Sequence, residues 1–264
     1  MVSNMTISNL AGRFGNQLFQ IAAGLTHSTK MGEPLLFNFS GELARYEQLE
    51  NVYRFQYWPT KDAYRDIRTH YEEPSWGYSP IPATPALWLS GYFQSDKHMM
   101  RKDLMIAALK GLLHLSFNET APKYDLVAHI RLGDYLALKD IHFVCREQYW
   151  RNALEHLKLP KESSVCVVTD GAYNLDAIEW IGTMWDDYFT TRPVVRCGLN
   201  YWDDLCIMRK AKSLIISNST FSWWASYFGD GYENLIAPDR WFGPSGPQDF
   251  QDIYRQDMTL IGVT

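Results

Sequence analysis

An arginine follows an apolar run near the middle of the chain, within the segment His129-Ile130-Arg131-Leu132-Gly133-Asp134-Tyr135. The run DLVAHIRL predicts a buried β-strand. Because side chains alternate along a strand, His129 and Arg131 should lie on one face, with Arg131 nearer the carboxyl end. A guanidinium there can bind two oxygens of a diphosphate, and Gly133 permits the turn that Asp134 would brace. A purely structural ion pair between Arg131 and Asp134 is the alternative.

A second polar segment joins the apolar run SLIIS to a predicted helix that starts near Phe221. Hydroxyls and backbone N–H groups at a helix start form an anion site, assisted by the positive end of the helix dipole. The residues expected to contact an anionic ligand there are Asn218, Ser219, Thr220, Phe221 and Ser222. Simple capping of the helix by Ser219 or Thr220 is the alternative. Trp223 and Trp224 are expected to be packing residues.

Two shorter segments also follow predicted strands. Gly12 to Gln17 is a glycine-bounded loop in which Arg13, Gly15 and Asn16 could approach a sugar or phosphate. Its spacing matches neither the dinucleotide-binding fingerprint nor the Walker loop. Asp170, directly after SSVCVVT, could accept hydrogen bonds from guanine or from ribose hydroxyls, and a turn cap is its alternative role.

The elements that must position these residues alternate between strand and helix. The opening predicts a strand (MTISNL), a helix over 17–30 and a second strand (PLLFNF), whereas residues 46–85 are irregular. A strand in LWLSGYF and a helix over 96–115 follow. The second half predicts five strands separated by helices at 147–157, 174–184, 202–211 and 221–228, a pattern typical of a parallel, doubly wound α/β sheet. The polar segment FNETAPKY suggests a domain seam, and we expect domains at 1–118 and 119–264.

Composition excludes several classes of protein. A formal net charge of −5 argues against a nucleic-acid partner, because such proteins normally carry a basic face. The four cysteines contain no CxxC pair, so their spacing predicts neither a zinc site nor a redox dithiol. No stretch has the pattern of a signal peptide or a membrane span, and a cytoplasmic location is therefore expected.

Together these segments resemble the α-1,2-fucosyltransferases of glycosyltransferase family eleven, in an order and spacing that span most of the chain. GRFGNQLFQ resembles the amino-terminal family motif, AHIRLGDY the HxRRGDY donor motif, and NSTFSWWASYF the carboxyl-terminal motif. GYFQS and DDLCIM are similar to lesser landmarks of the family. NSTFSWW is the most specific of these strings.

The resemblance implies a GT-B fold of two Rossmann-like lobes facing a cleft, with the acceptor on the first lobe and GDP-fucose on the second. It implies inverting transfer from GDP-β-L-fucose to a glycan without a metal or other cofactor. Arg131 takes the place of the donor arginine, and His129, Asp134 and Tyr135 match the other motif positions. The sequence departs at Leu132, where the pattern carries a second arginine, which bears on donor affinity more than on the reaction type.

Two other functions are consistent with the same motifs. One is a catalytically silent carbohydrate-binding protein of the same fold, which the intact Arg131 and NSTFS argue against. The other is a transferase of the same architecture that uses a different GDP-sugar.

Overall fold

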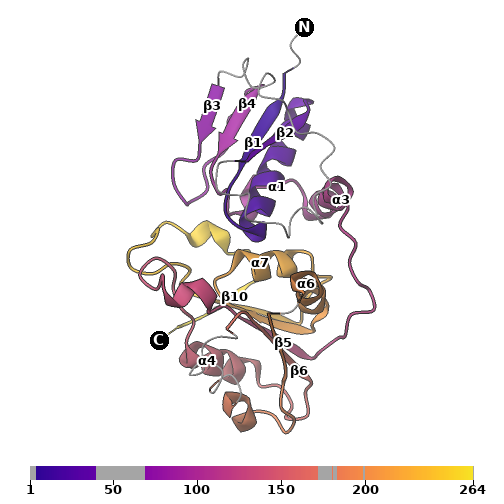
Figure 1. Cartoon of the computed structure of the whole chain (residues 1–264), viewed down its shortest axis with the longest axis vertical. Helices are drawn as coiled ribbons and strands as arrows, with labels where there is room; N and C mark the ends of the chain where they lie inside the picture. The colour runs from indigo at the N-terminus through magenta and orange to yellow at the C-terminus, as the bar shows by residue number, and fades with distance from the viewer. Residues whose placement is uncertain (1–3, 40–68, 172–179, 181–182, 199, 264) are drawn as a thin grey trace. The chain divides into compact units, whose positions relative to one another are not determined.

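The computed structural model describes residues 4–39, 69–171, 180, 183–198 and 200–263. The chain divides into two compact units (Figure 1). Unit 1 comprises Met1–Ser116 and Asp249–Arg255, and unit 2 comprises Phe117–Gln248 and Gln256–Thr264. The main division therefore lies two residues before the boundary expected from the sequence.

The segment Asp249–Arg255 belongs to unit 1, although the sequence places it in the second domain. Its carboxylates explain the difference. Asp249 accepts a hydrogen bond from the backbone N–H of Gly77 at 3.2 Å, and Asp252 accepts one from Tyr78 at 2.7 Å. Lys97 also pairs with Asp252. Nothing in the local sequence pattern indicates contacts between residues more than 150 positions apart.

Unit 1 is built on a parallel sheet with the strand order β2-β1-β4-β3. Its strands are β1 (Thr6–Leu10), β2 (Leu35–Phe39), β3 (Thr69–Glu72) and β4 (Leu87–Ser90), and its helices are α1 (Phe14–Met31), η3 (Asp96–His98), α3 (Lys102–Leu113) and η6 (Gln251–Ile253). The single helix expected over 96–115 is interrupted, because Met99 is extended and the N–H of Met100 donates to the Thr26 hydroxyl on α1 at 3.0 Å.

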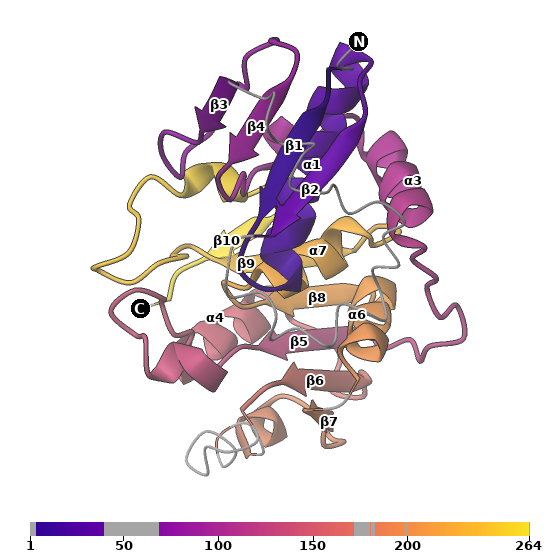
Figure 2. The same cartoon turned by 45° about the horizontal axis from the view of Figure 1, so that its top comes forward.

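Unit 2 is built on a six-stranded parallel sheet with the order β10-β9-β8-β5-β6-β7. Helices α6 and α7 lie on one side of this sheet and α4 on the other (Figures 1 and 2). The strands are β5 (Leu126–Ile130), β6 (Val165–Thr169), β7 (Val194–Cys197), β8 (Ser213–Ile216), β9 (Asn234–Pro238) and β10 (Thr259–Ile261). The helices are η4 (Gly133–Leu136), α4 (Glu147–Leu157), η5 (Met184–Asp187), α6 (Tyr201–Lys210) and α7 (Thr220–Tyr227). The expected α/β class with parallel, doubly wound sheets is confirmed.

The central strand β5 shows the predicted alternation of side chains. Leu126, Ala128, Ile130 and the following Leu132 are buried in one hydrophobic cluster with Trp150 of α4. His129 and Arg131 therefore lie on the opposite face, the face of α6 and α7. Leu132, where the family pattern has a second arginine, is a core residue that points away from Arg131.

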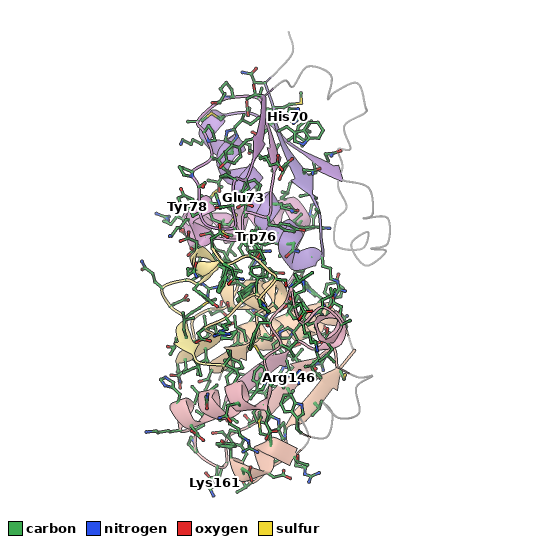
Figure 3. All side chains as sticks on the ribbon, turned by 90° about the vertical axis from the view of Figure 1, so that its left-hand side faces the viewer. His70, Glu73, Trp76, Tyr78, Arg146 and Lys161 are labelled. Atoms are coloured by element: carbon green, nitrogen blue, oxygen red, sulfur yellow. The ribbon has the colours of Figure 1, made fainter. Side chains whose placement is uncertain are left out.

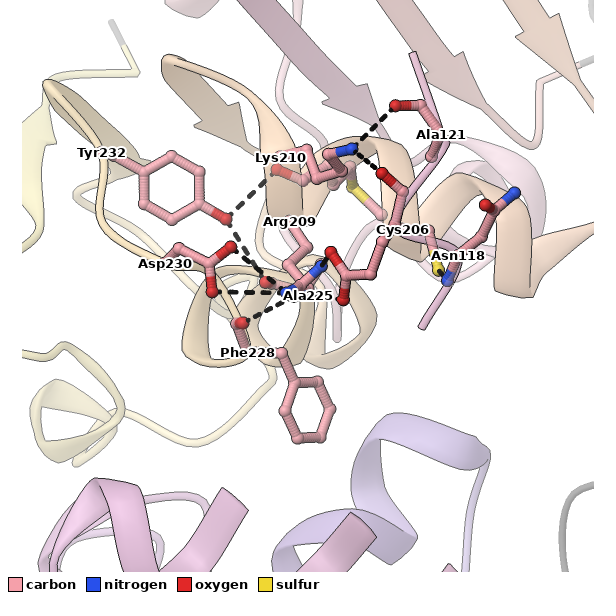
Figure 4. A network of polar contacts seen from close by, with 11 residues as sticks. Asn118, Ala121, Cys206, Arg209, Lys210, Ala225, Phe228, Asp230 and Tyr232 are labelled. Atoms are coloured by element: carbon pink, nitrogen blue, oxygen red, sulfur yellow. Dashed lines mark hydrogen bonds and ion pairs between the residues drawn. The ribbon is translucent and has the colours of Figure 1, made fainter. Parts of the chain in front are cut away.

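The start of unit 2 is attached to α6 and α7 by a polar network centred on Arg209 (Figure 4). This arginine is only 8% exposed, and its guanidinium donates to the carbonyl of Phe228, to Glu119 and to Asp230. Its guanidinium carbon also lies 4.8 Å from the centre of the Phe117 ring. A buried arginine is stable only when its donors are paired, so this network fixes the first residues of unit 2.

The amino ends of the unit 2 strands are joined through Asp125. Its carboxylate accepts from the backbone N–H of Ser164, at 2.9 Å, and from the Ser164 hydroxyl, and it pairs with Lys212. Ser164 precedes β6 and Lys212 precedes β8. The contact with Lys212, followed by the two hydrogen bonds from Ser164, lowers the pKa of Asp125 to about 2.

Two strands of the structure and one predicted helix also differ from the expected elements. The strands β3 and β10, both at sheet edges, carry polar or exposed residues and were not predicted. The helix expected over 174–184 falls mostly outside the described residues. In the part of the chain that the structure describes, no helix has the length and apolar character needed to cross a bilayer.

Asp125→Asn should reduce the acid sensitivity of unit 2. Because the folded-state pKa of Asp125 lies below the ordinary value, its stabilisation is fully present above about pH 4 and is lost as the pH falls toward 2. The variant should have a lower free energy of unfolding at pH 7, by about 0.5–1 kcal/mol, since the pair is partly solvated. Urea unfolding at pH 7, 4 and 2.5 measures both effects. A variant that loses stability as steeply as the wild type between pH 4 and 2.5 would contradict this role.

Candidate functional site

Arg131 is held between two carboxylates at the carboxyl end of β5. Its guanidinium forms ion pairs with Asp134 and with Asp170, and only 16% of its side chain is exposed. The guanidinium carbon lies 5.2 Å from the centre of the Tyr135 ring, within cation–π range. The ion pair between Arg131 and Asp134, left open as an alternative above, is present. The structure adds Asp170 as a second ion-pair partner of Arg131, although Asp170 follows a different strand, β6.

Asp170 connects the ends of β5 and β6. One carboxylate oxygen pairs with Arg131, and the other accepts the backbone N–H of Leu132 at 2.8 Å. Its carboxylate fills the space beside Gly133, where an added Cβ would lie 2.4 Å from the Asp170 Oδ2 atom. A larger residue at position 133 would therefore force the Asp170 carboxylate to shift, whereas the backbone conformation of Gly133 does not itself call for a glycine.

Tyr135 joins η4 to the loop that follows β8. Its hydroxyl donates to the carbonyl of Asn218 at 3.1 Å, and its ring stacks on His142 with a centroid distance of 4.3 Å. His142 had not been identified from the sequence, which contains no motif that marks it. Tyr135 therefore contacts both the ring of His142 and the guanidinium of Arg131.

His129 is buried and uncharged. Its side chain approaches the Ser217 hydroxyl, with 3.3 Å between Nδ1 and Oγ, and its ring centre lies 5.7 Å from that of Phe221. Burial, together with the nearby charge of Arg131, lowers the pKa of His129 to about 3. His129 can therefore contribute a hydrogen bond at neutral pH but not a positive charge.

Two residues of the NSTFS segment are structural and do not fit the ligand contacts expected of them. Asn218 is fully buried, and its amide donates to the carbonyls of Phe143 and Trp241 at 2.8 and 2.6 Å. Ser222 is also fully buried, and its hydroxyl donates to the carbonyl of Ser219 at 3.2 Å. Both side chains thus donate to backbone carbonyls inside the protein, as buried polar groups normally do.

The remaining residues of that segment form the start of α7. Ser219 is the N-cap residue, but its side chain makes no capping hydrogen bond, so the simple capping role considered above is absent for it. Thr220 and Phe221 are partly exposed. First-turn N–H groups have no acceptor within a helix, so this end of α7 offers donors to an anion. Trp223 and Trp224 are fully buried, which confirms their expected packing role.

Arg13, Gly15 and Asn16 belong to unit 1 and are not arranged as the predicted loop. Helix α1 begins at Phe14, so Gly15 and Asn16 lie in its first turn and exposed Arg13 is its N-cap. The helix starts early because the N–H of Gln17 already bonds to the carbonyl of Arg13 at 3.0 Å. Asn16 accepts a hydrogen bond from the side chain of Gln94 at 3.1 Å.

The described residues contain no group of three or more histidine, cysteine or acidic side chains arranged to hold a metal ion. The carboxyl edge of the unit 2 sheet thus combines one paired arginine, two carboxylates, a stacked tyrosine and a helix start. The net charge of Arg131, Asp134 and Asp170 together is −1, from one cation and two anions. An anion that binds here therefore competes with these carboxylates for the donors of the guanidinium.

The sequence model of glycosyl transferase family 11 matches residues 42–261. The chain is 35% identical over 121 residues to an alpha-1,2-colitosyltransferase of Escherichia coli, in an alignment that covers 43% of this chain and 40% of that enzyme. It is 24% identical over 259 residues to the galactoside alpha-(1,2)-fucosyltransferase 1 of Plecturocebus brunneus, covering 88% of this chain and 68% of the relative. The fucosyltransferase NodZ from Bradyrhizobium aligns with a TM-score of 0.44 at 13% identity, over 86% of this chain and 94% of that one.

Gly133→Ala should destabilise the fold by about 1–3 kcal/mol, because the new methyl group must displace Asp170 from Leu132 and Arg131. Gly111→Ala is the matched control. It lies in α3, where an added Cβ meets no atom within 4 Å, and it should be neutral or stabilising by up to about 1 kcal/mol. Urea unfolding compares the two variants. Equal unfolding free energies for them would refute the steric requirement at Gly133.

Proposed function

Because the chain belongs to glycosyl transferase family 11, we propose that it is a fucosyltransferase that moves L-fucose from GDP-β-L-fucose to a sugar hydroxyl. The proposed product is an α-1,2 linkage to galactose or a related residue. The names of both relatives above support the α-1,2 linkage, and the name of the second supports a galactoside acceptor. The observation that carries the proposal is the guanidinium of Arg131, positioned by two carboxylates at the carboxyl end of a central parallel strand.

The proposed chemical step is a displacement at the anomeric carbon of fucose. The acceptor hydroxyl attacks from the face opposite to GDP, the bond between that carbon and the β-phosphate oxygen breaks, and the electron pair stays on the phosphate. Such a step inverts the anomeric configuration from β to α. The acceptor proton leaves to a base that the described contacts do not single out.

Arg131 stabilises the leaving β-phosphate in this mechanism. A guanidinium has five N–H donors, so it can keep one carboxylate partner and still donate to phosphate oxygens. Asp134 is the partner that gives way, because its side chain is 37% exposed and Asp170 is also held by the N–H of Leu132. Asp170 then continues to orient the guanidinium while the phosphate takes the position of Asp134.

The start of α7 supplies further donors to the diphosphate in this proposal. Thr220 and Phe221 are the partly exposed residues of its first turn, and the positive end of the helix dipole favours an anion there. His129, being neutral, contributes at most a hydrogen bond. The guanidinium and the helix start thus stabilise the negative charge of the leaving diphosphate, a role that a divalent metal ion has in other enzymes. The proposed transfer is therefore metal-independent.

A second candidate donor is another nucleotide-linked deoxy sugar, such as colitose. The specific observation in its favour is the 35% identity to an alpha-1,2-colitosyltransferase. Competition between GDP-fucose and GDP-linked colitose for one acceptor distinguishes the two, because the preferred donor has the higher kcat/KM.

Arg131→Ala should lower kcat about 10²- to 10³-fold, the usual cost of removing one preorganised donor to a developing negative charge. Arg192→Ala is the matched control, because Arg192 is an exposed arginine of the same unit that pairs only with Asp186 among the described contacts. Release of GDP from GDP-fucose in the presence of lactose measures turnover, and circular dichroism verifies the fold. A folded Arg131→Ala enzyme with wild-type turnover would refute the proposed role.

Transfer should be unaffected by 10-fold excess EDTA over protein, because Arg131 and the start of α7 carry the charge of the leaving group. The measurement is the initial rate of GDP release before and after chelation and after addition of Mg²⁺ or Mn²⁺. A rate that collapses on chelation and returns with either metal would show that a divalent ion takes part.

A further inference from the structure

The carboxyl edge of the unit 1 sheet is tied together by side-chain amides. The side chain of Gln20 accepts from the N–H of Ala11, after β1, and donates to the carbonyl of Gly91, after β4, at 2.8 and 3.0 Å. Gln94, four residues after β4, donates to Asn16 on α1. Ligands of open parallel sheets bind beyond the carboxyl ends of the strands, so this edge is where a ligand of unit 1 is expected.

A buried carboxylate fixes the turn that follows β4. The side chain of Glu73 is 7% exposed, and its Oε2 atom accepts the N–H groups of Tyr92 and Phe93 at 2.7 and 2.9 Å. Phe93 has a φ of 52°, a left-handed conformation that is costly for an aromatic residue. Burial raises the pKa of Glu73, which the two N–H bonds oppose. Glu73 therefore holds a strained turn in one conformation.

The turn presents Tyr92 to Trp76 as a stacked pair. The two ring centres are 4.8 Å apart, with an interplanar angle of 19°, and both residues are only partly buried. Trp76 and Tyr78 lie close to Glu73 at one end of unit 1, whereas His70 lies toward the other end (Figure 3). Asp249 and Asp252 bind the backbone beside Trp76, at Gly77 and Tyr78. Rings fixed from both sides lose little entropy when a ligand packs on them.

The same turn contains hydrogen-bonding capacity that the protein leaves unused. Among the residues that the structure describes, the buried Oε1 atom of Gln94 has no hydrogen-bond partner. The same holds for the Nε2 atom of His98, which lies 3.7 Å from a carboxylate oxygen of Glu73. Gln94 and His98 are each at least 94% buried. The ring of His98 packs against Tyr78 and Phe93, the residues that follow Gly77 and Tyr92. Buried polar atoms are normally paired, so unpaired ones near the carboxyl edge that carries the aromatic pair point to a ligand with hydroxyl groups.

We propose that this edge binds the acceptor sugar, with a pyranose ring packed on the Trp76–Tyr92 pair and Glu73 acting as the positioning residue that holds Tyr92. The inference rests on the function proposed above. A β-galactoside suits the site because one face of its ring presents C–H groups, which pack on aromatic rings, while its hydroxyls face outward. Rigid aromatic surface combined with a few polar groups is the usual composition of a small-ligand site.

Trp76→Ala should raise the acceptor KM about ten- to hundredfold, and by more than it lowers kcat, because an apolar contact worth that factor is lost. Trp88→Ala is the matched control: Trp88 also stacks on a neighbour, His70, at 5.3 Å, but within the strands instead of at the carboxyl edge. The acceptor is the best substrate of the wild type among lactose, N-acetyllactosamine and free galactose. Tyr92→Leu, which keeps an apolar side chain in the turn, is the second variant if Trp76→Ala does not fold.

Glu73 provides the test of the positioning role. Glu73→Gln keeps a side-chain oxygen for the N–H groups of Tyr92 and Phe93 and should raise the acceptor KM less than Glu73→Ala does. If Glu73 were instead the base that takes the acceptor proton, Glu73→Gln would lower kcat by about 10²- to 10⁴-fold, and the positioning role would be overturned.

The outcomes separate this inference from the proposed function. Suppose that the wild-type enzyme transfers fucose but that Trp76→Ala, Tyr92→Leu and Trp88→Ala have equal acceptor KM values. This result would overturn the acceptor site and leave the proposed function standing. A wild type that transfers fucose to none of the three sugars and releases no GDP would overturn the proposed function and, with it, the site. The thermal shift caused by GDP, measured on each variant, verifies that donor binding is retained.

Discussion

The guanidinium of Arg131, held by Asp134 and Asp170, is the interaction on which the arrangement of unit 2 around its candidate site depends. Asp170 reaches Arg131 from the neighbouring strand and at the same time fixes the backbone at Leu132. The Asp170 carboxylate lies against Gly133, the first residue of η4, and Tyr135 of the same helix lies beside the arginine. An arginine positioned by two carboxylates is preorganised, and its partial exposure leaves it available to an anion.

The two ends of the unit 2 sheet have different roles. At the amino end, Asp125 pairs with groups that precede two other strands, which stabilises the sheet. At the carboxyl end, Asn218 satisfies buried carbonyls so that the loop between β8 and α7 can carry a helix start next to β5. Unit 1 follows the same plan, with Gln20 and Glu73 fixing the loops at its carboxyl edge. In both units, buried side chains that need not contact a ligand position the residues at the carboxyl edge that are available to bind one.

Much of this arrangement could be predicted from the sequence, because it follows from local periodicity. The apolar runs around Ala128 and Ile215 indicate buried parallel strands, and alternation places His129 and Arg131 on one face. The roles of Asn218 and Ser222 could not be predicted, since hydroxyl and amide groups at a helix start suit a ligand as well as a backbone carbonyl. The pairing of Asp170 with Arg131, and of Asp252 with Lys97, joins residues distant in sequence, and no local pattern encodes such contacts. The strand β3 was missed because an exposed edge strand lacks the apolar signal.

The most direct test of the account is a crystal structure of the chain with GDP. The account predicts a β-phosphate oxygen at about 2.7–2.9 Å from a guanidinium nitrogen of Arg131, with Asp134 displaced and Asp170 still accepting the N–H of Leu132. A complex in which Arg131 keeps both carboxylates while the diphosphate binds elsewhere would contradict it.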